Sequence, residues 1–159
     1  FSLEQVNSKE GPDWKVWDQP NDYPSQGFRA FWAAEAARTQ GDEAFERYHF
    51  KLLDVKHIEK ADIADLKVLS DAAESAGLDV VRFKNDMTDR RLLSRLVEDH
   101  TYAQTLGIFG TPTLVFPNKK AVFVKISETP SAADGSTFFQ EVWNVANRPF
   151  VQELTWPNP

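Results

Sequence analysis

The side chains that most often carry out chemistry are few in this chain, and cysteine is absent from its 159 residues. That absence excludes disulfides, thiolate metal sites and cysteine nucleophiles within these residues. The three histidines, His49, His57 and His100, match no metal-binding spacing, so we expect no metal and no other cofactor. Glu98 and Asp99 precede His100 directly, but neighbouring positions on a helix point in different directions. We therefore expect no catalytic residue within the chain.

The most informative segment is Phe109-Gly110-Thr111-Pro112, which follows a long predicted helix and precedes a predicted strand. A cis bond before Pro112 would expose the main chain of Thr111 to an incoming extended peptide. The alternative is a proline that merely begins an edge strand, where only one ladder N–H is lost. We take Phe109, Gly110, Thr111 and Pro112 as the candidate substrate-binding residues.

The composition limits the classes of partner. The chain is 42% hydrophobic and 26% charged, which is typical of one folded domain with a real core. A net charge of −6 and a pI of about 5.1 predict no binding to nucleic acid or to anionic lipid. Apolar runs of the roughly twenty residues that a membrane span needs are missing, so we expect no membrane partner.

Most of the chain has helical periodicity. Residues 1–24 contain Gly11-Pro12 and further prolines, which predicts an irregular arm. Capping residues and apolar faces then predict six helices. Their ranges are 25–40, 42–57, 65–76, 80–86, 88–105 and 131–146.

A β-hairpin is predicted from 113–116 and 121–126, with turn residues between them. An isolated hairpin is marginally stable in water, so further strands are needed to pair its open edges. Both strands are apolar at successive positions, which is typical of strands covered on both faces. Within the chain only Phe1-Ser2-Leu3 offers a weak strand, so we expect the other strands to lie upstream of Phe1.

The order of predicted elements resembles the second part of the DsbA-like thioredoxin-fold family. This order is a helical block, a strand that begins Gly-Thr-Pro-Thr, a hairpin and a final helix. The resemblance is to the branch with cytoplasmic FrnE-like proteins and 2-hydroxychromene-2-carboxylate isomerases. It implies an α/β thioredoxin-like fold with a helical insertion, whose N-terminal sheet strands lie outside this chain. Residues 1–24 would end the N-terminal thioredoxin half, 25–106 would form the insertion, and 107–159 would form the C-terminal half with the cis-Pro loop.

The resemblance implies that the intact protein is a thiol-disulfide oxidoreductase, with its Cys-x-x-Cys upstream of Phe1 and this chain as a fragment. Thr111 and Pro112 would then align a thiol or disulfide substrate, either a protein or a small molecule. Phe28, Phe31 and Trp32 would overhang the thiol site. A cytoplasmic location and a homodimer are further expectations.

Two alternatives stay open at this point. One is a glutathione-dependent isomerase of the 2-hydroxychromene-2-carboxylate type, in which a serine or cysteine acts on bound glutathione. The other is a non-catalytic binding module that uses the edge from Phe109 to Thr113 to hold a peptide or a partner protein.

Overall fold

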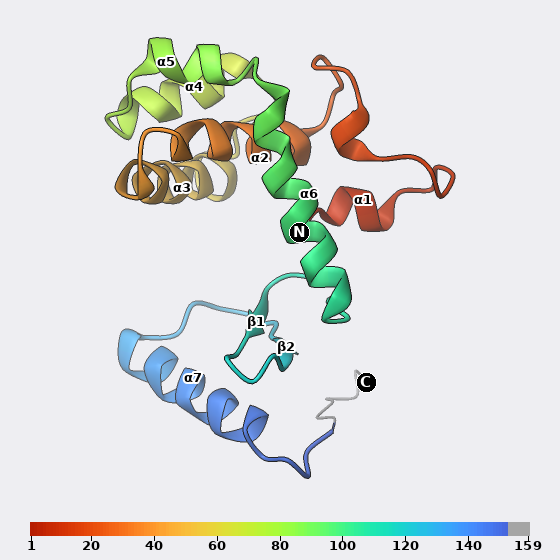
Figure 1. Cartoon of the computed structure of the whole chain (residues 1–159). Helices are drawn as coiled ribbons and strands as arrows, with labels where there is room; N and C mark the ends of the chain where they lie inside the picture. Colours follow the sequence, from red (N-terminus) through yellow and green to blue (C-terminus); the bar gives the residue numbers. More distant parts are fainter. Residues whose placement is uncertain (153–159) are drawn as a thin grey trace. The chain divides into compact units, whose positions relative to one another are not determined.

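The computed structural model describes residues 1–152 and forms two compact units, Phe1–Thr101 and a second unit that begins at Tyr102 (Figure 1). No helix among the described residues is long and apolar enough to cross a membrane. The elements of unit 1 are α1 (Leu3–Asn7), η1 (Val16–Asp18), α2 (Gln26–Arg38), α3 (Asp42–His57), α4 (Leu66–Ser75), α5 (Val80–Asp86) and η2 (Arg90–Leu92). Helix α6 (Leu93–Thr105) crosses the division, and unit 2 contains β1 (Thr113–Val115), β2 (Ala121–Phe123) and α7 (Ala132–Ala146).

Capping residues mark the ends of the helices. The Ser25 hydroxyl accepts a hydrogen bond from the Phe28 N–H, which caps the start of α2. Helix α4 ends at Ser75, and Gly77 two residues later has a φ of 74°, in the left-handed region. The next residue, Leu78, donates its N–H to the Ala73 carbonyl at 3.0 Å and closes the last turn. The helices predicted over 42–57 and 80–86 are confirmed at those residues.

The core of unit 1 lies among α2, α3, α4 and α5. Tyr48 and Phe83 are fully buried, and their ring centroids are 5.3 Å apart. Burial raises the pKa of the Tyr48 hydroxyl. A second cluster holds Phe28 and Trp32, which are 1% and 2% exposed. These two rings, which we expected to overhang a thiol site, therefore belong to the core.

Two segments differ from the sequence-based expectation. Phe1-Ser2-Leu3 is not a strand, because the Ser2 hydroxyl accepts from the Gln5 N–H and starts the short helix α1. The helix expected over 88–105 is divided into η2 and α6. Asp89 caps η2 and accepts from the Arg91 N–H.

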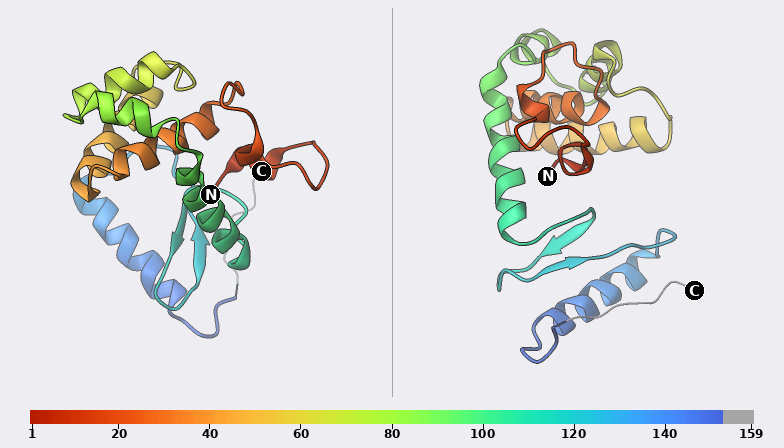
Figure 2. Two further views of the ribbon diagram at one scale, coloured as in Figure 1. Left: turned by 45° about the horizontal axis from the view of Figure 1, so that its top comes forward. Right: turned by 90° about the vertical axis from the view of Figure 1, so that its right-hand side faces the viewer.

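The sheet within the described residues has two strands, β1 and β2, which pair antiparallel with Leu114 opposite Val122. Helix α7 lies against the hairpin (Figure 2), where Phe116 contacts Phe139 and Trp143. Phe123 in β2 remains 39% exposed. The described part of the chain therefore does not cover both faces of the hairpin, although the apolar strand sequences predict full coverage.

Candidate functional site

The chain turns at Gly107, between the end of α6 and the predicted binding residues 109–112. Gly107 has a φ of 69° just after α6. It donates its N–H to the Gln104 carbonyl at 3.0 Å, and Ile108 donates to Ala103 at 3.1 Å. This pair of hydrogen bonds is the Schellman arrangement that ends a helix and turns the chain. The loop that follows therefore starts from a fixed direction.

The four predicted binding residues follow directly. The bond between Thr111 and Pro112 is cis, and both residues are exposed. The Thr113 hydroxyl donates to the Gly110 carbonyl at 2.7 Å, and the Pro112 carbonyl accepts from the Val124 N–H at 3.1 Å. These bonds fasten the loop to the start of the hairpin.

Two phenylalanine rings border the loop. The Phe109 side chain is 70% exposed, and its ring centroid lies 5.2 Å from that of Phe123. A Cβ on Gly110 would come within 3.2 Å of the Phe123 ring, so glycine at this position leaves room for the aromatic pair. The structure thus places a large apolar surface beside the exposed residue Thr111.

The register of the hairpin leaves one edge of β1 open within residues 1–152. Leu114 lies opposite Val122, and the hydrogen bonds from the Val124 N–H to the Pro112 carbonyl and from the Phe116 N–H to the Lys120 carbonyl fix the alternation of the ladder. In such a ladder the main-chain groups of every second residue point away from the partner strand. For β1 these are Thr113 and Val115, and of the two only Thr113 belongs to the edge predicted from the sequence. The sequence feature that indicates this open edge is the apolar strand itself, for which the described residues supply a partner strand on one side alone.

The loop can bind but has no group for acid–base chemistry. Residues 108–113 contain no ionisable side chain. Within residues 1–152 no cluster of three or more metal-binding side chains occurs. The chemistry that this edge offers is main-chain hydrogen bonding plus apolar contact, which is the pattern by which an extended peptide is held.

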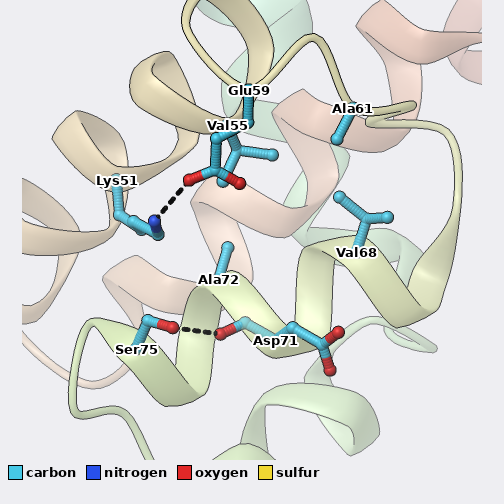
Figure 3. A pocket seen from close by; sticks show the side chains of 8 residues that line it. All are labelled: Lys51, Val55, Glu59, Ala61, Val68, Asp71, Ala72 and Ser75. Atoms are coloured by element: carbon cyan, nitrogen blue, oxygen red, sulfur yellow. Dashed lines mark hydrogen bonds and ion pairs between the residues drawn. The ribbon is translucent and has the colours of Figure 1, made fainter.

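A shallow pocket of about 180 Å³ in unit 1 is a weaker candidate (Figure 3). Its lining includes the apolar residues Val55, Ala61, Val68 and Ala72. The polar groups at its rim already have partners: Lys51 lies 2.7 Å from Glu59, and the Ser75 hydroxyl donates to the Asp71 carbonyl. The pocket therefore offers no free convergent polar group to orient a ligand.

The histidines do not assemble a site in the structure. His49 and His57 are exposed, whereas His100 is 2% exposed. The Ser2 N–H donates to Nδ1 of His100 at 3.2 Å, and the Phe1 ring stacks on the imidazole at a centroid distance of 5.2 Å. Burial lowers the pKa of His100, and the nearby positive charge of Lys15 lowers it further. His100 is a packed structural histidine.

Sequence comparison relates the chain to two adapter proteins. It is 29% identical over 117 residues to the ClpXP adapter protein SpxH of Bacillus subtilis (strain 168). This match covers 72% of this chain and 39% of that protein. It is 31% identical over 102 residues to the ClpXP adapter protein SpxH of Shouchella clausii (strain KSM-K16). This match covers 63% of this chain and 34% of that protein. The chain thus spans little more than a third of the length of these relatives.

A family model described as thioredoxin matches residues 1–131. The match includes the helices of unit 1, the Gly110-Thr111-Pro112 loop and both strands of the hairpin. It extends over most of the 159 residues and accords with the α/β thioredoxin-like fold expected from the sequence. The chain belongs to the thioredoxin family.

Proposed function

We propose that the intact protein binds a polypeptide partner along the edge formed by Phe109, Gly110, Thr111 and Pro112. The observation that carries this proposal is the exposed residue Thr111, next to a cis peptide bond and beside the 70% exposed Phe109. Extended peptides bind such edges through main-chain hydrogen bonds, while apolar neighbours add affinity. Because the loop contains no ionisable side chain, binding is the activity that its chemistry supports.

The relatives support a role in protein binding. Both are ClpXP adapter proteins, and an adapter works by holding other proteins. Because the chain covers only part of their length, we carry over binding in general and propose no specific partner. We place the protein in the cytoplasm, as expected from the family branch that the sequence resembles.

The test uses the full-length protein and a polypeptide that cannot exchange disulfides, namely reduced and carboxymethylated α-lactalbumin labelled with a fluorophore. We expect Phe109→Ser and Thr111→Arg each to weaken binding about tenfold, because one removes an apolar anchor and the other obstructs the backbone edge. Fluorescence anisotropy measures both affinities.

The matched control is Phe150→Ser, because Phe150 is another exposed phenylalanine of unit 2, at 79%. We expect this control to bind within about twofold of the wild type, since a scattered surface side chain contributes little. Equal binding by the wild type and by both edge variants would overturn the proposal.

A thiol-disulfide oxidoreductase of the DsbA-like, FrnE-like branch is the second candidate, and the thioredoxin family match favours it. Its dithiol would come from outside residues 1–159, since these contain no cysteine. A thiolate would attack a substrate disulfide while Thr111 and Pro112 align the substrate backbone. No observation favours the glutathione-dependent isomerase.

Reduction of insulin by the full-length protein separates these two functions. Turnover that Thr111→Arg slows would favour the oxidoreductase. Binding of carboxymethylated α-lactalbumin without any turnover would favour the adapter-type role.

A further inference from the structure

Helix α3 has one face packed into unit 1 and another on which large side chains remain exposed. Its buried side chains are Ala44, Tyr48, Leu52 and Val55, which face the core shared with α2 and α4. Large side chains nevertheless continue around the helix. Phe50 is 60% exposed and Leu53 is 41% exposed. Such a surface is unusual on a packed helix, where polar residues normally cover the outer side.

Five side chains form one continuous row, which we name the outer stripe: Phe45, His49, Phe50, Leu53 and His57. All are exposed except Phe45, which is half-buried beneath the Arg38 guanidinium at 3.4 Å from its ring centroid. The Phe45 and His49 rings stack at a centroid distance of 5.7 Å, and the His49 and Phe50 rings lie edge to face at 5.9 Å. Leu53 and His57 continue the row at the four-residue spacing that places side chains on one face. From Phe45 to His57 the stripe is about 18 Å long.

Carboxylates surround the outer stripe, and we name them the acidic flank: Asp42, Glu43, Glu46 and Asp54. All four are exposed. Among the described residues none of the four forms a salt bridge within 4.0 Å. Glu46 and Asp54 lie four residues before and after Phe50, so their charges border the most exposed ring of the stripe.

The cations of α3 are already engaged elsewhere. Arg47 donates from Nε to the Ala76 carbonyl at 2.9 Å, and Lys51 lies 2.7 Å from Glu59. Lys56 donates to the Gln26 side-chain oxygen. Glu59 neutralises Lys51, whereas Arg47 and Lys56 bind neutral oxygens and keep their charges. The four carboxylates of the acidic flank outnumber these two cations, so the net charge beside the outer stripe is negative.

We propose that the outer stripe and the acidic flank of α3 form a docking surface for a basic amphipathic helix of a partner protein. The row Phe45, His49 and Leu53 is a four-residue ridge of the kind that fits between the ridges of a second helix. Apolar residues of the partner helix would cover the stripe, and its flanking Lys and Arg would meet the acidic flank. The stripe length corresponds to about three turns of such a helix.

A second copy of the chain fits this surface less well than a basic helix does. A two-fold contact would bring the acidic flank against the same carboxylates of the other copy. The whole chain also carries a net charge of −6. Like charges at an interface oppose association, so charge complementarity selects a basic partner.

The test measures binding of a synthetic helical peptide to the full-length protein by fluorescence anisotropy. The peptide is about 18 residues long, enough for the stripe and its ends, with Leu at i, i+3, i+4 and i+7 and Lys on both sides. A control peptide has Glu in place of Lys. We expect the Lys peptide to bind at least about tenfold more tightly, and its affinity to fall between about 50 and 300 mM salt.

Variants localise the binding. We expect Leu53→Ser to weaken binding of the Lys peptide about tenfold. The double variant Glu46→Lys with Asp54→Lys should lower affinity by a similar factor and flatten its salt dependence. The matched controls are Val81→Ser, an 82% exposed apolar residue on α5, and Glu98→Lys, an exposed carboxylate on α6. Both controls should stay within about twofold of the wild type.

Three results would overturn the proposal. The first is equal affinity for the Lys and Glu peptides, or no binding of the Lys peptide. The second is a loss of affinity in Val81→Ser as large as that in Leu53→Ser. The third is a dimer by light scattering that Leu53→Ser dissociates, because a second copy would then occupy the stripe.

Discussion

At the residue scale, the environment of His100 couples the N-terminal arm to helix α6. Nδ1 accepts the Ser2 N–H, so the folded state needs that nitrogen unprotonated. The Phe1 and Trp17 rings lie 5.2 and 5.3 Å from the imidazole centroid and exclude water. A proton on Nδ1 would remove the acceptor and place a charge among aromatic rings. The fold therefore favours neutral His100.

This environment predicts a loss of stability in mild acid. Folding lowers the pKa of His100 below its ordinary value of about 6.5, chiefly through burial. The contribution of His100 to stability is therefore fully present above about pH 6.5 and is lost as the pH falls through the folded pKa. We expect the free energy of unfolding, measured by urea titration with tryptophan fluorescence, to fall between about pH 7 and 5.

A non-titrating variant checks the assignment. His100→Gln keeps a side-chain oxygen that can accept the Ser2 N–H, and it should flatten the pH dependence. His57→Gln, at an exposed position, should leave the dependence unchanged. A wild-type pH profile that His100→Gln reproduces would show that another group is responsible.

At the element scale, Gly77 sets the end of α4. Its φ of 74° is in the left-handed region, and a Cβ built on it would meet no atom within 4 Å. Gly77→Ala therefore imposes only the backbone cost of that conformation, about 1 kcal/mol. The free energy of unfolding should fall by this amount, as measured by urea titration.

Gly11→Ala is the matched control for Gly77→Ala. Gly11 likewise has open space around its Cβ position, but its φ lies outside the left-handed region. Alanine should therefore be tolerated there with little loss of stability. Equal destabilisation by the two variants would contradict the backbone explanation.

Local signals in the sequence predicted most of the helices. Ser25, Gly77 and Ser131 mark helix boundaries in the structure, as their capping chemistry predicts. The burial of His100 was not predictable, because it depends on Phe1 and Trp17, which are distant in the sequence. The start of α6 was also missed, since a capping aspartate at position 89 produces a separate short turn.

At the scale of the whole molecule, the thioredoxin family assignment agrees with the fold class expected from the order of elements. The loop at Thr111 was predictable from its glycine, threonine and proline residues after a long helix. The open edge of β1 at Thr113 and Val115 required the register, which residue types alone do not determine. The domain limits expected at 24 and 106 stay predictions.

In the proposed function a polypeptide lies along the edge from Phe109 to Pro112. Whatever strands pair β1 in the intact protein, the Phe109 side chain projects from the loop before the strand begins. A reactive group in its place would therefore touch a bound polypeptide. This contact needs no assumption about thiol chemistry.

Photocrosslinking of the full-length protein tests this claim most directly. A benzophenone amino acid replaces Phe109 in one variant and Phe150 in the other, and labelled carboxymethylated α-lactalbumin is the probe. We predict a crosslinked product from position 109 and little from position 150. Equal yields from both positions, or a product from position 150 alone, would contradict polypeptide binding at this edge.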